Sequence, residues 1–299
     1  MIDYKQLQAL AAILEEGNFD KAAEKLNISQ SAVSQRLKQL EDSVGQTLII
    51  RNTPIQATTA GQLLLKHYHQ VSLLQAELQE QISLEQSDGF TKISIGLNAD
   101  SLATWFLDAV KPLLDDEKIL LDLKLDDQDQ THHFLKTGQV IGCISSNPKP
   151  MQGCSCIPLG VMIYRCLASP DYINQYFPDG INTEDFYNAP VAEFNNKDEL
   201  QNRYLKDNFK IGPNEYPKHR IPSTESFFNI IIRGHACGMV PDQQSKELQA
   251  SGKVVDMTPG RFIEVPLYWH IWSLKSGLFQ RLTQRLRKQA ECDLSPISH

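Results

Sequence analysis

The spacing of apolar residues changes near residue 89 and separates the chain into two kinds of structure. Up to about residue 85, apolar residues recur every three or four positions, which is the period of an amphipathic helix. Beyond residue 89, short apolar runs of strand length alternate with helical segments. Strands that alternate with helices form parallel sheets with right-handed crossovers. The pattern therefore predicts a helical N-terminal region followed by an α/β region.

Three helices are expected at the N-terminus, and the third is the most informative. One side of it is an apolar stripe made of Val33, Leu37 and Leu40. Ser29 is a good N-cap, so this helix should begin at Gln30, and Asn18 can cap the helix before it. Residues 27–29 then form a short turn between two helices, which is typical of a helix-turn-helix.

The opposite face of the third helix is polar, and its side chains suit the recognition of DNA. Gln can make paired hydrogen bonds to adenine, and Ser can bond several base edges in the major groove. Together with cations for the phosphates, the predicted DNA contacts are Ser29, Gln30, Ser31, Ser34, Gln35, Arg36, Lys38 and, further along the chain, Arg51. A helix with a merely solvated polar face has the same periodicity, so the neighbouring elements must decide between the two interpretations.

A short hairpin and a long helix follow. Residues 48–50 and 55–57 flank a turn that contains Pro54, as expected for a wing. After this hairpin the chain is predicted to be helical to about Glu85. Apolar residues spaced mainly by seven form a seam along this helix: Leu64, Val71, Leu74 and Leu78. Such a seam usually pairs with a second copy, so these residues are predicted to form a homodimer.

In residue type, spacing and order, these elements resemble the LysR-type transcriptional regulators. The resemblance is carried by residues 22–41, by residues 45–51 and by Thr59-Ala60-Gly61. A match of this length is far more specific than a lone short motif. Two residues that are usual in the family are missing, a Phe near Ile49 and a second Arg near Gln56. Contacts of the wing with the DNA backbone should therefore depend mainly on one arginine.

The resemblance implies an all-α winged helix-turn-helix with a long linker helix, followed by an α/β effector region of two lobes that is similar to periplasmic binding proteins. Two crossover strands, expected near Ile163 and Pro266, would join the lobes, and a small molecule would bind in the cleft between them. The implied boundaries are 1–58 for the DNA-binding head, 59–88 for the linker and dimerisation helix, 89–163 with 266–299 for lobe I, and 164–265 for lobe II.

Several short blocks resemble the arginine- and lysine-responsive branch of the family, among them residues 102–105 and 267–270. A basic amino acid needs hydrogen-bond donors for its carboxylate and carboxylates for its amines. The candidate donors, at a helix N-terminus, are Ser101 and Thr104. The candidate carboxylates, near predicted strand or helix ends, are Asp126, Asp127, Glu193 and Glu225. Each has a structural alternative, either at a helix start or in a solvated acidic run.

Composition and charge agree with a soluble protein of the cytoplasm. Of the 299 residues, 41% are hydrophobic and 22% are charged, which is ordinary for a globular chain. No apolar run approaches the roughly 20 residues that span a bilayer, so no membrane partner is expected, and no signal peptide is evident. The net charge of −7 gives no general attraction to nucleic acid, and residues 1–58 hold six Lys or Arg against seven Asp or Glu. Tight binding to DNA should therefore require both heads of a dimer.

No metal site and no cofactor is predicted. The six cysteines lack the paired spacing of a zinc site, and Cys154-Ser155-Cys156 is the pair that could suggest a metal or redox role. Cytosolic cysteines are most often buried reduced thiols. His132 and His133 are adjacent and point in different directions on a helix, so we expect them at the surface, whereas Trp105 and Trp269 are expected in the core.

The predicted function is transcriptional regulation, and the protein is not expected to be an enzyme. A small effector, arginine or lysine, would close the cleft and change the geometry of a dimer or tetramer. This change would alter contacts with double-stranded DNA and RNA polymerase at genes of amino-acid transport or metabolism. The alternatives are a ligand-insensitive architectural or origin-binding DNA protein and a LysR-type regulator with another small effector. An enzyme is disfavoured because the sequence has no Gly-rich phosphate loop, no Gly-x-Ser-x-Gly motif and no metal-ligand cluster.

Overall fold

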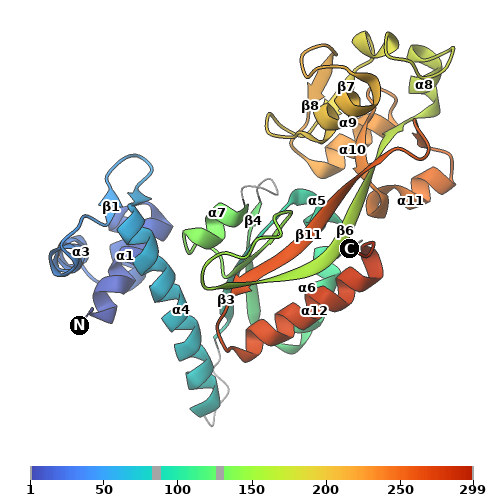
Figure 1. Cartoon of the computed structure of the whole chain (residues 1–299). Helices are drawn as coiled ribbons and strands as arrows, with labels where there is room; N and C mark the ends of the chain where they lie inside the picture. Colours follow the sequence, from blue (N-terminus) through green and yellow to red (C-terminus); the bar gives the residue numbers. More distant parts are fainter. Residues whose placement is uncertain (1, 83–88, 126–130, 298–299) are drawn as a thin grey trace.

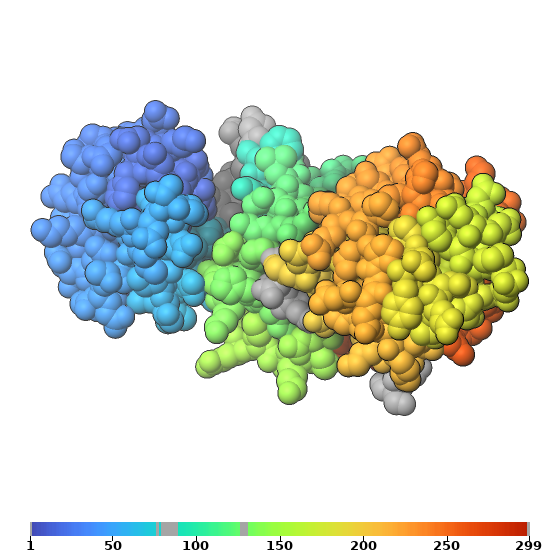
Figure 2. Space-filling view, turned by 90° about the horizontal axis from the view of Figure 1, so that it is seen from above, coloured from blue at the N-terminus to red at the C-terminus, as the bar shows by residue number. Residues whose placement is uncertain are grey.

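The computed structural model describes residues 2–82, 89–125 and 131–297. Three bodies follow one another, with the N-terminal helical head at one end, lobe II at the other and lobe I between them (Figures 1 and 2). The predicted fold class is confirmed by three helices with a wing, a long helix, and a mixed sheet with helices packed on it. No helix among these described residues is long and apolar enough to cross a membrane.

The head contains the helix-turn-helix that the sequence predicts. Its elements are α1 (Tyr4–Glu16), α2 (Phe19–Leu26), α3 (Gln30–Val44), β1 (Ile49–Ile50) and β2 (Gln56–Ala57). Asn18 caps α2 by accepting a hydrogen bond from the Asp20 amide at 2.7 Å. The Ser29 hydroxyl caps α3 by accepting one from the Ala32 amide at 3.2 Å. α3 ends at Gly45, where a positive φ of 74° suits a residue without a side chain.

The predicted apolar stripe of α3 is buried. Val33, Leu37 and Leu40 pack in one hydrophobic cluster with residues of α1 that include Leu10 and Ile13. Burying one such side chain contributes roughly 1.5–3 kcal/mol. The cluster therefore fixes how α3 stands against α1, and it leaves the polar face of α3 toward solvent.

The linker helix α4 (Thr59–Ile82) lies between the head and lobe I (Figure 1). On the head side, the hydroxyls of Tyr4 and Ser72 share a hydrogen bond of 2.6 Å, and Leu64 packs against the head core. Leu73 packs against the core of the lobes. α4 is therefore held by both bodies within one chain.

The two lobes share one mixed sheet of seven strands. These are β3 (Thr91–Leu97), β4 (Ile119–Leu125), β5 (Gly142–Ser145), β6 (Cys154–Ala168), β9 (Gly238–Pro241), β10 (Val255–Asp256) and β11 (Phe262–Trp272). The order is β10-β6-β11-β5-β3-β4, with β9 paired to the second half of β6. β3 is parallel to β4 and β5, as the alternation of strands and helices predicts, while β11 is antiparallel to β5 and β6.

Two long strands, β6 and β11, run through both lobes. They pair in antiparallel register along the whole of β11, with Ile163 opposite Glu264 near the lobe II end of the ladder. The apolar run 161–167 predicts only the second half of β6, because its first half is partly exposed and carries fewer apolar residues. The ladder shifts register between Leu267 and Tyr268, which is a β-bulge.

The C-terminal segment braces this bulge. The amide of Val161 donates to the carbonyl of Ser295 at 2.7 Å, and the Ser295 amide donates back at 3.0 Å. Beside this bridge, a Cβ atom on Gly160 would lie 2.6 Å from the Cβ of Leu294. The space that a side chain at position 160 would need is therefore occupied by Leu294 and Ser295.

Helices cover the sheet in both lobes. Lobe I has α5 (Ala99–Ser101), the π-helix η1 (Leu102–Phe106), α6 (Leu107–Asp116), α7 (Thr131–Lys136) and α12 (Gly277–Asp293). Lobe II has α8 (Pro170–Tyr176), the 3-10 helix η2 (Asp185–Tyr187), α9 (Leu200–Phe209), α10 (Thr224–Ile232) and α11 (Asp242–Ala250). A second, two-stranded parallel sheet in lobe II pairs β7 (Val191–Glu193) with β8 (Lys218–Arg220).

Three aromatic predictions can be compared with the packing. Trp105 and Trp269 are fully buried, as expected, and the indole N–H of Trp269 donates to the Thr283 hydroxyl of α12 at 3.0 Å. Of the two adjacent histidines predicted at the surface, His133 is exposed, whereas His132 is half-buried. Because α7 lies on the sheet, the His132 ring turns inward and packs 4.3 Å from the His270 ring in a T-shaped contact.

Candidate DNA-binding face and interlobe cleft

The residues predicted to contact DNA gather on the solvent side of α3 and on the wing. Ser34 and Arg36 are half-buried, and the others are exposed: Ser29, Gln30, Ser31, Gln35, Lys38 and Arg51. The Ser29 hydroxyl already caps α3 and shares a 2.9 Å hydrogen bond with Ser31. Ser29 is therefore the N-cap of α3, as predicted, and its role in DNA contact remains a prediction.

Two cations of the head, Lys25 and Arg51, make contacts within the head. The ammonium of Lys25 bonds to Glu15 at 2.8 Å and to Glu16 at 2.7 Å, so its charge is neutralised within the head. The Arg51 guanidinium stacks on Phe19, 5.7 Å from the ring centroid. This contact holds the wing arginine beside the start of α2. Contacts of the wing with DNA phosphates would depend on this arginine.

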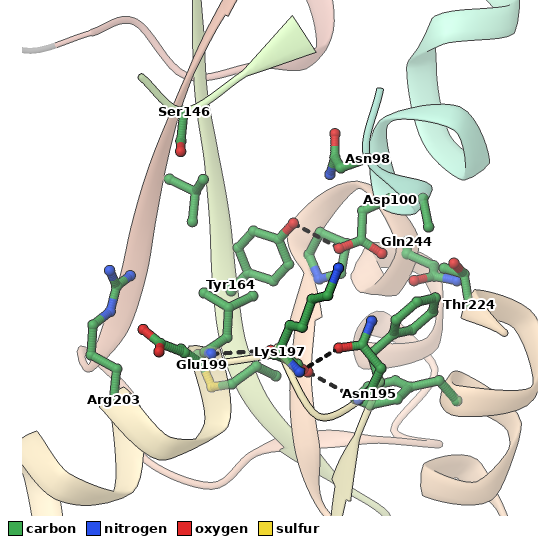
Figure 3. Close-up of a pocket in the computed structure, with 18 of the residues that line it drawn as sticks. Asn98, Asp100, Ser146, Tyr164, Asn195, Lys197, Glu199, Arg203, Thr224 and Gln244 are labelled. Carbon is green, nitrogen blue, oxygen red and sulfur yellow. Dashed lines mark hydrogen bonds between the residues drawn. The ribbon is translucent and has the colours of Figure 1, made fainter. Parts of the chain in front are cut away.

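A cavity of ≈ 780 Å³ lies between the two lobes and has the size of a small-ligand site (Figure 3). Lobe I contributes Asn98, Asp100 and Ser146, while the crossing strands contribute Tyr164 and Glu264. The polar residues from lobe II are Asn195, Lys197, Asp198, Glu199, Arg203, Thr224 and Gln244. Residues of both lobes and of their connecting strands therefore face one space, so a molecule in it would touch all three.

Asp100 is a carboxyl of this cavity whose pKa is raised. Desolvation by burial raises its pKa to about 6, opposed by a hydrogen bond of 2.8 Å from the Tyr164 hydroxyl and reinforced by the negative charge of Asp198. Figure 3 shows this hydrogen bond at the centre of the site. Among the described residues, no cation contributes to the pKa shift of Asp100, so a cationic group of a ligand beside it would stabilise its ionised form.

Asn98 supplies unused hydrogen-bonding capacity next to Asp100. Its side chain is 5% exposed, and neither its amide nitrogen nor its amide oxygen has a hydrogen-bond partner among the described residues. The hydroxyl of the fully buried Ser101 also lacks one. Buried polar groups are normally paired, so an unpaired amide that lines a cavity indicates a place for a polar ligand.

The charge of the cavity lining is negative. Among the described residues, its acidic and basic side chains are four carboxylates, on Asp100, Asp198, Glu199 and Glu264, and two cations, on Lys197 and Arg203. Asp198 also accepts hydrogen bonds from the amides of Phe194 and Leu200, both at 3.0 Å, and so shapes the loop before α9. The excess of carboxylates favours a ligand with a net positive charge or at least one cationic group.

None of the predicted effector residues that the structure describes is part of this lining. The Thr104 hydroxyl donates to the backbone carbonyl of Asp100 at 2.6 Å, and Ser101 is buried behind the cavity wall. Glu193 is neutralised by the Lys218 ammonium at 2.6 Å, and it also accepts from Tyr216. Glu225 is exposed at the start of α10 and its neighbour Thr224 lines the cavity instead. Asp126 and Asp127 lie outside the described residues.

The predicted dimerisation seam is only partly exposed. Two of its residues, Leu74 and Leu78, are 42% and 54% exposed. Leu63, which precedes the predicted Leu64 and was not part of the seam, is 64% exposed. Leu64 itself packs into the head core and Val71 is half-buried. The apolar face that α4 leaves to solvent is therefore formed by Leu63, Leu74 and Leu78.

A group of thiols and imidazoles lies on the sheet of lobe I, away from the cavity. The Cys156 sulfur is 3.7 Å from Nε2 of His270, which also contacts the Asn147 carbonyl at 2.8 Å. Burial lowers the pKa of His270 to about 4 and raises that of Cys143 to about 12. Within the described part of the chain, no three such side chains are arranged to hold a metal ion.

The N-terminal 4–62 segment matches the family model of the bacterial regulatory helix-turn-helix proteins, lysR family. The HTH-type transcriptional regulator ArgP of Pseudomonas aeruginosa (strain UCBPP-PA14) is 40% identical over 299 residues, which cover 100% of this chain and 99% of that protein. The chain belongs to the LysR family. It is a LysR-type transcriptional regulator, as its helix-turn-helix and its spacing of elements predict.

Two solved structures of the LysR family share the whole architecture. ArgP from Mycobacterium tuberculosis is 36% identical with a TM-score of 0.88, and the match covers 99% of this chain and 100% of that one. Full-length LysG from Corynebacterium glutamicum with bound effector Arg is 34% identical with a TM-score of 0.79, covering 98% and 100%. The predicted arginine- and lysine-responsive branch of the LysR family is thereby confirmed as the one that this chain resembles.

Proposed function

We propose that this LysR-type regulator binds a basic amino acid, arginine or lysine, in the cavity between its lobes, and that this effector controls its binding to double-stranded DNA. The single observation that carries the proposal is Asp100. It is a carboxylate whose pKa is raised to about 6 in a negatively charged cavity of ≈ 780 Å³. A guanidinium or ammonium group beside it would stabilise its ionised form.

The other end of such a ligand also has partners. A free amino acid carries a carboxylate and an α-ammonium group besides its side chain. Lys197 and Arg203 are the cations of the lining, and the unpaired amide of Asn98 can both donate and accept. Figure 3 shows Lys197 projecting into the same cavity as Asp100. The bound arginine of the LysG structure supports the same class of ligand.

Control of DNA binding would follow from the position of the cavity. A ligand that contacts both lobes favours the closed arrangement by its differential affinity for it. In a homodimer or tetramer formed through α4, closure would change the spacing of the two heads, and with it the DNA half-sites that they reach together. Contact with RNA polymerase at genes of amino-acid transport or metabolism belongs to this proposal. The relatives' role as regulators supports a non-enzymatic function.

The test measures binding of L-arginine, L-lysine and L-citrulline to the full-length protein by calorimetry and thermal melting. Citrulline has the shape of arginine without its charge. We expect arginine or lysine to bind and to raise the melting temperature, because a ligand specific for the folded state stabilises it. Citrulline should bind at least about 30-fold more weakly, since an uncompensated buried charge costs roughly 2 kcal/mol or more.

A pair of variants locates the site. Asp100→Asn should weaken arginine binding by about 30-fold or more, whereas Glu225→Gln, on the exposed start of α10, should leave it unchanged. DNA affinity is then measured by fluorescence anisotropy on a duplex selected from a random pool. Binding of arginine without any change in DNA affinity would point to a ligand-insensitive DNA protein, and equal binding of citrulline would contradict recognition by charge.

A further inference from the structure

Two glycine turns of lobe I lie against the linker helix α4. Gly138, between α7 and β5, has a φ of 74°, and Gly153, directly before β6, has a φ of 73°. A Cβ atom on Gly138 would lie 2.7 Å from the Cα of Lys66 and 2.9 Å from its backbone nitrogen. One on Gly153 would lie 4.0 Å from the Lys66 ammonium nitrogen. Of these two turns, only the Gly138 turn therefore touches the backbone of α4. We call this contact the Gly138 seat.

The Gly138 seat is rigidly tied to the sheet of lobe I. The amide of Ile141 donates to the carbonyl of Ser94 in β3 at 2.9 Å, and the Gln139 amide donates to the carbonyl of Phe134 in α7 at 2.9 Å. The Lys124 ammonium of β4 adds a bond of 3.3 Å to the Gln139 side chain. The turn must therefore move together with β3, β5 and α7.

The same segment reaches the interlobe cavity. Ser146, the first residue after β5, lines the cavity, and Leu125, the last residue of β4, lines it as well. A movement of β5 that accompanies closure of the lobes is therefore delivered to the Gly138 turn. The atoms of α4 nearest to this position are the Cα, the Cβ and the backbone nitrogen of Lys66, so the contact is made close to the helix backbone.

The receiving side of the contact is connected to the head. Lys66 lies two residues after Leu64, which packs in the head core, and six residues before Ser72, which bonds to Tyr4 of the head. Leu73 keeps the same helix against the core of the lobes. A shift of α4 at Lys66 would thus carry the head with it.

We infer that the Gly138 seat transmits the state of the cavity to the DNA-binding head. Closure on a ligand displaces the turn, and the turn pushes or releases the backbone of α4 at Lys66. This inference rests on the proposed function, because it assumes a ligand that changes the arrangement of the lobes.

The two glycines provide a matched pair of variants in the full-length protein. Gly138→Ala and Gly153→Ala introduce the same strain of a left-handed backbone, but only Gly138→Ala places a methyl group against the helix backbone. Calorimetry measures L-arginine binding, and anisotropy measures affinity for the selected duplex with and without L-arginine. We expect both variants to bind arginine within about threefold of wild type. The arginine-induced change in DNA affinity should persist in Gly153→Ala and shrink at least about fivefold in Gly138→Ala.

The outcomes separate the inference from the proposed function. If wild type does not bind arginine, the proposed function fails and the inference fails with it. If arginine binds and Gly138→Ala keeps the full change in DNA affinity, the inference alone is overturned. Should Gly138→Ala not fold, hydrogen exchange on wild type decides instead. Added arginine should alter the exchange of amides 66–73, and unaltered exchange there would overturn the inference.

Discussion

The Tyr164 hydroxyl donates to the Asp100 carboxylate at 2.8 Å and so links a strand common to both lobes to the first helix of lobe I. This hydrogen bond lowers the pKa of Asp100, whereas desolvation by burial and the negative charge of Asp198 raise it. The carboxylate is therefore only partly compensated. Three consequences can be measured.

Arginine binding should depend on pH. With a pKa of about 6, Asp100 is mostly protonated at pH 5 and mostly ionised at pH 7. If only the ionised form binds the cation, affinity falls roughly tenfold from pH 7 to pH 5. Calorimetry across this range measures the slope, and Asp100→Asn should bind weakly without it. A wild-type affinity that is constant from pH 5 to 7 would contradict a role for Asp100 in binding.

The same carboxyl should affect stability without ligand. Its folded pKa lies above its ordinary value of 3.8, so between about pH 4 and pH 6 the folded protein binds more protons than the unfolded chain. Its contribution to the free energy of unfolding is then greatest below pH 4 and is lost as pH rises through 6. Urea unfolding should show Asp100→Asn gaining stability relative to wild type as pH rises from 4 to 7. If Asp100→Asn instead loses stability relative to wild type over this range, the predicted sign is wrong.

Removing the Tyr164 hydroxyl should weaken the cationic site without unfolding it. Tyr164→Phe keeps the buried ring and deletes the donor to Asp100, so the pKa of Asp100 should rise further. A hydrogen bond to a charged group contributes roughly 1.5–3 kcal/mol, which corresponds to a rise of about one to two pKa units, so the ionised fraction of Asp100 at pH 7, and with it the arginine affinity, should fall roughly two- to fifteenfold. The midpoint of the pH profile should move upward in parallel. Weaker binding with an unchanged midpoint would indicate a packing effect instead.

Base contacts and phosphate contacts of α3 can be separated by salt dependence. Gln35→Ala should cost about 1–3 kcal/mol on the selected duplex and little on a random duplex. Lys38→Ala should weaken binding to both and lower the slope of log affinity against log salt by about one. Anisotropy titrations at several salt concentrations give both quantities. Equal losses on both duplexes for Gln35→Ala would argue against base recognition by this side chain.

The exposed apolar face of α4 should be needed for self-association. Replacing Leu74 and Leu78 by Asp puts charges on a face that a second copy would cover, so sedimentation should report monomers. DNA affinity should fall steeply, because a single head carries few free cations. Gln75→Asp, on an exposed neighbouring position of the same helix, serves as the charge control. A double variant that remains dimeric would exclude this face as the main interface.

The head was predictable from sequence because its determinants are local. The cap of Ser29, the stripe of Val33 and Leu37, and the end at Gly45 each depend on residues within a few positions, and all are found as expected. The seam of α4 was less predictable. Heptad spacing selected Leu64, but the contact of α4 with the head turns Leu64 inward and leaves Leu63 in solvent.

The lining of the cavity depends on contacts between distant segments. Asp100 lies one residue before the predicted Ser101, yet only the approach of Tyr164, 64 residues away, distinguishes them. Glu193 looked equally suitable at a strand end. Its neutralisation by Lys218 follows from the pairing of β7 with β8, which no local pattern reveals.

The continuous ladder of β6 and β11 limits how the lobes can move. A ribbon of paired strands resists separation but can change its twist, most easily at a bulge. The bulge between Leu267 and Tyr268 lies beside the bridge from Val161 to Ser295. The lobes should therefore rotate relative to one another about this bulge, and we expect the backbone bridge between Val161 and Ser295 to limit the range of that rotation.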